Sequence, residues 1–217
     1  MAIRTIDDIK LQDIAVAIQG KDGGGTMTVD EMPTRIATIP TQDNTTLNSL
    51  IDRSITSIEN EEVTSIGVSA FYSCTNLTSV SLPNATRIES SAFYSCSNLT
   101  SVSFPNATRI GVSTFQNCSN LTSVSFPNAT SISAGTFQNC SNLSILILGK
   151  RATLSNSNAF SGANNAIIYV KPGDLKWYST ATNWSMLYAN NRIKSIEDLT
   201  GDDLAWYQEQ LARYQAA

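Results

Sequence analysis

Apolar and small polar residues alternate along a short stretch of the chain, and this stretch returns at a constant spacing, so that Ile66 corresponds to Ile88, Ile110 and Ile132. In Leu77-Thr-Ser-Val80-Ser-Leu82, serine separates the apolar residues at 80 and 82, a period-two pattern typical of a strand with one buried face. Between Ile66 and Leu148 the pattern occurs three times in full and once in part. The repeated apolar columns are Phe71, Phe93, Phe115 and Phe137; Cys74, Cys96, Cys118 and Cys140; Leu77, Leu99, Leu121 and Leu143; and Val80, Val102, Val124 and Leu146.

So short a strand cannot bury its apolar face or pair its backbone alone. Stacking successive copies as parallel strands about 4.8 Å apart meets both needs, and the long return path between copies favours a solenoid. Extending the register in both directions predicts degenerate end strands at Ile55–Ile58 and Ile167–Val170. We therefore predict an α/β solenoid with one parallel sheet of about six short strands, flanked by N-terminal and C-terminal helices.

The repeated motif Ala-Phe-x-x-Cys-x-x-Leu-x-x-Val-x-Leu-Pro fits Ala70 to Pro83, and it recurs from Ala92 to Pro105 with phenylalanine in place of the last leucine. It resembles the BspA-like leucine-rich repeat family of bacterial surface antigens, over roughly residues 45 to 195. The resemblance implies a leucine-rich repeat solenoid that binds partners on the open side of its sheet.

Residues 1–40 are expected to form two short helices. The first begins near Thr5 and ends at Gly20, and Thr28 to Glu31 has the spacing of a capping box that begins the second. The segments Ile18-Gln-Gly-Lys21 and Met27-Thr-Val-Asp-Glu31-Met32 resemble phage and prophage tail-associated proteins, which implies docking to a phage tail or other particle proteins. The predicted division is a docking segment at 1–40, a capped solenoid at 41–200 and a C-terminal helix at 201–217.

Composition narrows the classes of function. Hydrophobic residues make up 41% of the chain and charged residues 15%, with a formal net charge of −4. A chain without a positive footprint or a nucleic-acid motif is not expected to bind nucleic acid. No run of about 18 apolar residues and no basic start with a short apolar core occurs, so neither membrane insertion nor a secretory signal peptide is expected in this sequence.

The candidate chemistry is sparse. The chain has no histidine, which excludes Ser-His-Asp and Cys-His nucleophile systems, and no catalytic constellation, metal site or cofactor is expected. Four cysteines in a line along a solenoid cannot surround one zinc ion, so buried free thiols are favoured. Glu59, Glu61 and Glu62 form one acidic cluster, which fits either Ca²⁺ binding or the solvation of an edge strand.

Small hydroxyl residues are expected on the open side of the sheet, where they would bind a glycan or a protein or simply form a soluble strand face. The candidate binding residues are Thr78, Ser79, Ser81, Thr100, Ser101, Ser103, Thr122, Ser123 and Ser125. Ile145 and Ile147 take the same outward positions, so an apolar patch there should meet the C-terminal segment or another chain. The C-terminal helix, with Leu204, Tyr207, Leu211 and Tyr214 on one stripe, is expected to pack on the solenoid or to join chains into a homo-oligomer.

The leading hypothesis is a non-enzymatic phage or prophage tail-associated protein, receptor-binding or tail fibre-like, that contacts a protein or glycan on a bacterial surface. The first alternative is a BspA-like bacterial cell-surface adhesin, and the second is a structural virion or decoration component. The corresponding locations are the virion and the bacterial cell surface.

Overall fold

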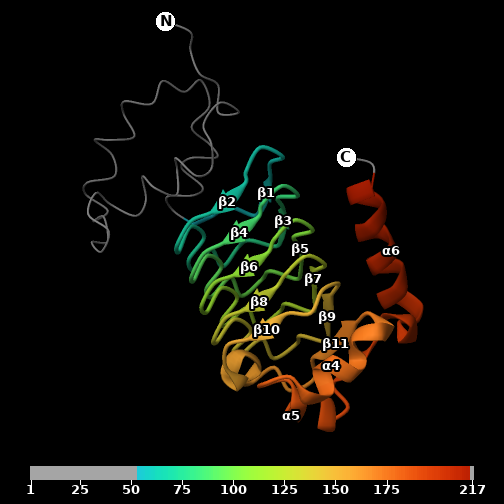
Figure 1. The fold of residues 1–217 in the computed structure, drawn as a ribbon. Helices are drawn as coiled ribbons and strands as arrows, with labels where there is room; N and C mark the ends of the chain where they lie inside the picture. The colour runs from blue at the N-terminus through green and yellow to red at the C-terminus, as the bar shows by residue number, and fades with distance from the viewer. Residues whose placement is uncertain (1–52, 216–217) are drawn as a thin grey trace, which may run out of the picture.

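Short parallel strands stacked along one axis form the body of the molecule (Figure 1). The computed structural model describes residues 53–215. In the Ser-Val-Ser strands valine is buried while the serines lie on the other face, as the alternation predicts. The larger sheet has seven strands in the order β1 (Ser57–Glu59), β3 (Ser79–Ser81), β5 (Ser101–Ser103), β7 (Ser123–Phe126), β9 (Ile145–Leu148), β11 (Ile167–Val170) and β12 (Ile193–Ser195).

The sheet keeps the register of the sequence repeat. Ile58 pairs with Val80, and Leu146 pairs with Ile168, so both degenerate end strands are confirmed. The prediction of six strands is one short in this sheet, because β12 follows β11 in parallel with Ile193 opposite Ile168. The sequence hides that strand, since the helical segment between β11 and β12 breaks the constant spacing of the repeat.

A second parallel sheet lines another side of the coils, so the prediction of a single sheet is wrong. Its two-residue strands come from a column in which Ile66, Ile88, Ile110 and Ile132 are buried, each after a polar residue. Strands this short carry too few residues for the alternation to be visible. The second sheet runs in the order β10 (Thr153–Leu154), β8 (Ser131–Ile132), β6 (Arg109–Ile110), β4 (Arg87–Ile88) and β2 (Ser65–Ile66).

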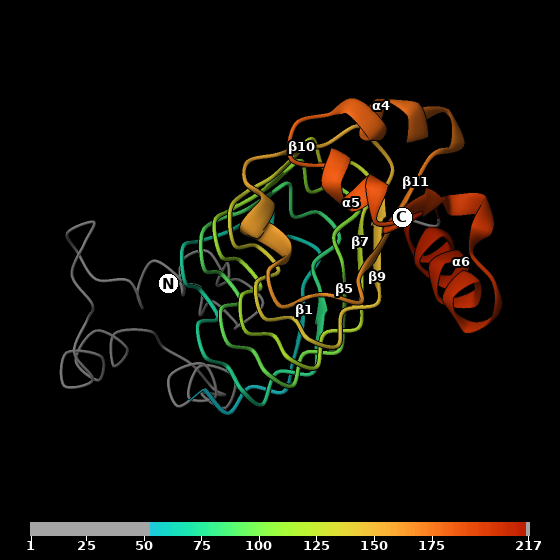
Figure 2. The ribbon, with the colours of Figure 1, turned by 90° about the horizontal axis from the view of Figure 1, so that it is seen from below.

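The coils enclose a single interior along the axis, as the view from below shows (Figure 2). Buried aromatic rings stack along this interior. The ring of Phe93 lies between those of Phe71 and Phe115, at centroid distances of 5.2 and 5.4 Å. The stack continues through Phe137 to Phe160, with centroid distances of 5.9 and 5.4 Å. The one-axis arrangement predicted from the repeated columns is therefore confirmed, and each ring contacts its counterparts in adjacent coils.

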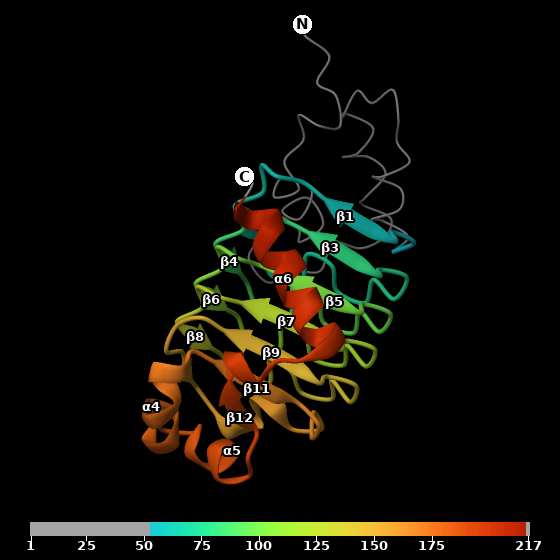
Figure 3. The ribbon, with the colours of Figure 1, turned by 90° about the vertical axis from the view of Figure 1, so that its right-hand side faces the viewer.

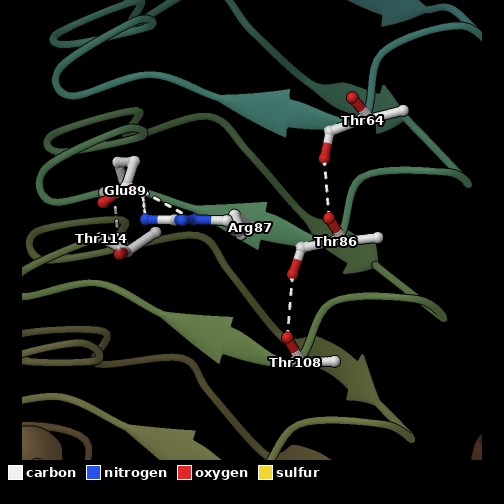
Figure 4. A network of polar contacts seen from close by, with 6 residues as sticks. All are labelled: Thr64, Thr86, Arg87, Glu89, Thr108 and Thr114. Carbon is white, nitrogen blue, oxygen red and sulfur yellow. Dashed lines mark hydrogen bonds and ion pairs between the residues drawn. The ribbon is translucent and has the colours of Figure 1, made fainter.

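Threonine hydroxyls join neighbouring coils outside the second sheet (Figure 4). Thr86 Oγ1 donates to the Thr64 carbonyl at 3.1 Å, and Thr108 Oγ1 donates to the Thr86 carbonyl at 3.3 Å. Beside them Arg87 and Glu89 form an exposed ion pair at 2.7 Å. The Thr-x-Ile column thus uses its polar side chain for coil-to-coil hydrogen bonds.

Aromatic residues close the last coil. The buried Trp184 donates through Nε1 to the Ala152 carbonyl at 2.7 Å, and its ring lies 6.0 Å from that of Phe160. Tyr178 donates to the Lys150 carbonyl at 3.0 Å. The helical elements of this end are η2 (Ser157–Phe160), η3 (Pro172–Asp174), α4 (Leu175–Thr180), α5 (Ser185–Ala189), η4 (Ile196–Asp198) and α6 (Gly201–Gln215).

The two helices and the docking role predicted for residues 1–40 lie outside the described residues. The boundaries predicted between docking segment, solenoid and C-terminal helix stay predictions. Within residues 53–215, no helix combines the length and the apolar character that crossing a membrane requires.

Candidate functional site

The outer face of the seven-stranded sheet carries two rows of small polar side chains, which we call the serine face. The pairing of β1, β3, β5 and β7 places one row in register as Ser57, Ser79, Ser101 and Ser123, and a parallel row as Glu59, Ser81, Ser103 and Ser125. Neighbouring strands lie about 4.8 Å apart, so hydroxyl groups repeat at that spacing along the solenoid axis.

The C-terminal helix α6 crosses in front of this face (Figure 3). Its residues Leu204, Trp206 and Tyr207 pack against a buried cluster that contains Ile145 and Ile147. These isoleucines occupy positions that hold serine in β7, so they provide an apolar patch where the helix binds. The prediction that this patch meets the C-terminal segment is confirmed. The alternative, that the helix joins two chains, stays a prediction.

A groove of about 380 Å³ lies between α6 and the first three strands of the sheet. Serine hydroxyls and strand backbone form its floor, and helix side chains form its wall. Both ionisable residues in its lining, Glu59 and Glu209, are carboxylates. The lining residues are Ser57, Ile58, Glu59, Ser79, Val80, Ser81, Ser101, Val102, Ser103, Trp206 and Glu209.

The structure divides the nine candidate binding residues into groups. Ser79, Ser81, Ser101 and Ser103 line the groove. Ser123 and Ser125 lie on the next strand, β7, outside its lining. Ser103 and Ser125 belong to the outer row of the sheet, as predicted, but they are only 6% and 2% exposed and are therefore buried there. The strands that carry them, β5 and β7, lie inside the sheet and behind α6 (Figure 3).

The three threonines of the candidate set stabilise the stack of coils. Thr78 Oγ1 donates to the Thr56 carbonyl at 2.9 Å. Thr100 and Thr122 repeat this hydrogen bond to the preceding coil, at 3.3 and 3.0 Å. Their hydroxyl protons are therefore engaged within the protein, and the threonines stand beside the strands that face the groove. Sequence reasoning did not separate them from the serines, because both columns read as exposed hydroxyl positions.

Sequence reasoning also missed the wall of the groove. Trp206 lies off the apolar stripe of its helix, and nothing in the sequence shows which part of the sheet the helix crosses. Glu59 belongs to the acidic cluster with Glu61 and Glu62, and its place on β1 also puts it in register with Ser81. Ile145 and Ile147 carry a usable sequence signal, because apolar residues at outward positions indicate where the helix packs. The strands that keep serine at these positions are then the ones that the helix does not pack against.

The repeats match a known family. A model described as the BspA type leucine-rich repeat region, in six copies, fits residues 47–167. The chain belongs to the BspA-type leucine-rich repeat family. The stacked parallel strands of the structure agree with the leucine-rich repeat solenoid that this membership implies.

Among solved structures, the BspA-type chain is similar to a leucine-rich cell surface protein from Faecalibacterium prausnitzii A2-165. The two share 19% sequence identity with a TM-score of 0.39, over 57% of this chain and 43% of that protein. The chain thus spans less than half the length of that protein. No curated protein sequence matches the chain. Neither match supports the phage-tail hypothesis, which rests on residues 1–40.

The cysteine column of the BspA-type repeats is buried and structural. The four thiols are free, and Cys118 Sγ donates to the Phe93 carbonyl of the preceding coil at 3.1 Å. Burial raises the pKa of Cys74 to about 11 and that of Cys140 to about 12, which keeps the thiols protonated at neutral pH. The interpretation of these residues as small buried hydrophobes is confirmed.

Within residues 53–215, no group of three or more His, Cys, Asp or Glu side chains is placed to hold a metal ion. Glu59 belongs to β1, the edge strand of the larger sheet, while Glu61 and Glu62 are exposed in the bend that follows. This position agrees with the edge-strand interpretation of the acidic cluster, because charged side chains discourage further strand pairing.

Proposed function

We propose that this chain is a non-enzymatic binding module of a bacterial surface adhesin, whose ligand lies in the groove between α6 and the serine face. The groove is the observation that carries the proposal. Membership of the BspA-type family supports the surface role. Compared with the phage-tail hypothesis, the adhesin hypothesis draws on residues 47–167 and does not depend on residues 1–40.

The architecture suits binding because it holds the groove rigid. Each floor serine belongs to a strand whose inward residue is buried, and Ile58, Val80 and Val102 anchor the three strands. A preorganised surface loses little conformational entropy when a ligand binds. The binding proposed here therefore needs no rearrangement of the sheet.

Cell binding tests the proposal. Fluorescently labelled full-length chain is titrated onto a panel of bacterial cells, together with the variants Ser79→Tyr and Ser131→Tyr. Ser79 is exposed in the groove floor, so tyrosine there fills the space that a ligand needs. Ser131 is the matched control, because it is a serine on a strand of the other sheet.

We expect saturable binding that Ser79→Tyr weakens at least tenfold and Ser131→Tyr leaves unchanged. Binding that saturates on no cell type would contradict a surface-binding role. Equal affinity of both variants would show that the ligand binds elsewhere on the molecule.

A further inference from the structure

We infer that the ligand of the groove is an oligosaccharide, neutral or amine-bearing, with Trp206 as the platform on which a sugar ring stacks. This inference rests on the proposed function and specifies its ligand. It is carried by three properties of the groove: the arrangement of its hydroxyls, the aromatic residue in its wall and the sign of its charge.

The floor presents hydroxyl groups as a regular array. Ser57, Ser79 and Ser101 lie in register on three successive strands, with Ser81 in the adjacent row. A serine hydroxyl offers one donor and two acceptor positions, and so does each hydroxyl of a sugar. Such an array therefore complements a polyol in many orientations.

An extended peptide fits the same floor less well. Side chains on one face of an extended peptide recur at about 6.6 Å, whereas the strands of the floor recur at about 4.8 Å. The two spacings do not match, so only the first few side chains could align with serines. Peptides that bind sheets add a strand at an open edge. Of the three floor strands only β1 lies at an edge of the sheet, while β3 and β5 are paired on both sides, so a peptide lying across the floor meets no free edge at β3 or β5.

The wall of the groove supplies an aromatic surface, which the polar floor lacks. Trp206 of α6 is half-buried, with one part in the apolar cluster under the helix and another at the groove. An indole face carries partial negative charge, which attracts the C–H groups of a sugar ring and attracts an ammonium group more strongly. Tryptophan thus provides apolar area and orientation for a ligand that the serines hold by hydrogen bonds.

Charge selects among saccharides. Glu59 on β1 places a carboxylate in the lining of the groove, and among the described residues no lysine or arginine belongs to that lining. Sugars that carry carboxylate, sulfate or phosphate are disfavoured by this field, and sugars that carry a free amine are favoured.

A saccharide array tests the inference with the full-length chain and its variants. The array carries neutral, amine-bearing and acidic oligosaccharides, with a pool of extended peptides for comparison. Trp206→Leu keeps an apolar contact beneath α6 but removes the aromatic face, and Trp206→Phe restores an aromatic ring. Tyr72→Ala serves as the control, because this exposed tyrosine stacks on Tyr94 and is not part of the groove.

We expect binding to neutral or amine-bearing saccharides, at least tenfold weaker for Trp206→Leu and within threefold of the parent for Trp206→Phe and Tyr72→Ala. Glu59→Gln should reduce the preference for amine-bearing over neutral sugars. Binding to peptides alone, preference for acidic sugars, or equal affinity of Trp206→Leu and the parent would each overturn the inference.

Treated cells separate this inference from the proposed function. Periodate oxidation of surface sugars should abolish cell binding, and protease treatment should leave it. If protease alone abolished binding that Ser79→Tyr also weakens, the groove would bind a protein, so the surface-binding proposal would stand and the saccharide inference would be wrong. Loss of saturable binding on untreated cells would contradict the proposed function itself.

Discussion

At the scale of single residues, the fold depends on columns of identical side chains that contact one another from coil to coil. Phe115 is fully buried, and its ring is stacked between Phe93 and Phe137 at 5.4 and 5.9 Å. Stacked aromatic pairs contribute about 0.5 to 1.5 kcal/mol beyond the area that they bury. The side chain therefore stabilises three coils at once.

Phe115→Ala should lower the free energy of unfolding by about 3 to 5 kcal/mol, since it leaves a cavity and removes two ring contacts. Chemical denaturation followed by circular dichroism measures the change. Tyr72→Ala, which removes a stacked but exposed ring, is the control and should cost less than about 1 kcal/mol. Equal losses for the two variants would mean that the interior stack does not stabilise the fold.

The cysteines predict a pH dependence of stability. Burial raises the thiol pKa from an ordinary value of 9.0 to about 11 for Cys74 and about 12 for Cys140, and it raises that of Cys118 well above 9.0. A raised folded-state pKa means that stability is full below the unfolded pKa and is lost as pH rises. The free energy of unfolding should fall above pH 9.0, by roughly 1.4 kcal/mol per pH unit for each thiol.

Urea denaturation at steps between pH 8 and 11 measures that slope. Cys118→Ala should reduce the slope of the free energy of unfolding against pH by the contribution of one thiol. Ser131→Ala should leave this slope unchanged. A slope unaffected by the cysteine substitution would show that other groups cause the loss of stability.

At the scale of elements, close contact between the backbones of successive coils sets the geometry. A Cβ atom at Gly111 would lie 2.5 Å from the backbone nitrogen of Ser90, in the coil before. At Gly173, in η3, a Cβ atom would have no neighbour within 4 Å. The same substitution therefore has opposite consequences at the two positions.

Gly111→Ala should destabilise the protein by about 1 to 3 kcal/mol, because two backbones must move apart to admit the methyl group. Gly173→Ala should change stability by less than about 0.5 kcal/mol. Thermal unfolding of the two variants beside the parent checks both values. Comparable midpoints for both would contradict the tight backbone contact.

Helix α6 shows which elements the sequence can and cannot place. Its start near residue 201 and its apolar stripe are readable, and so is the patch of Ile145 and Ile147 that receives it. The direction in which it crosses the sheet depends on side-chain packing between distant segments, so the groove and the role of Trp206 emerge only in three dimensions. The second sheet was missed for a local reason, because two residues per strand leave no alternation to detect.

At the scale of the whole molecule, the repeat makes the solenoid predictable. Successive coils pair in one register, and each contacts its neighbours. The structure of one coil therefore predicts the structure of the next. The ends differ because an open core must be capped, and there the spacing that separates Leu146 from Ile168 gives way to the longer one from Ile168 to Ile193. The sequence accordingly predicts the register of the larger sheet inside the array, but it does not reveal the seventh strand at the C-terminal end.

This regularity predicts tolerance to insertions of whole coils. A second copy of residues 88–109, placed directly after Arg109, should give a folded chain, because every new strand and hydroxyl meets a partner in the existing register. A half-coil insertion of residues 88–98 at the same point should unfold the array, since it puts strand residues opposite turn residues. Circular dichroism and sedimentation velocity distinguish the outcomes. A misfolded whole-coil variant would show that neighbouring coils are not interchangeable.

The near identity of successive coils also bears on heredity. Stretches of DNA that encode almost the same coil can misalign during replication or recombination, and each exchange then adds or removes one complete coil. Because the helix is anchored over β9 and β11 while the groove lies over β1 to β5, a coil gained between them would shift the helix away from its opposing floor. Copy number would then set the offset between the helix and the groove floor without any substitution in either.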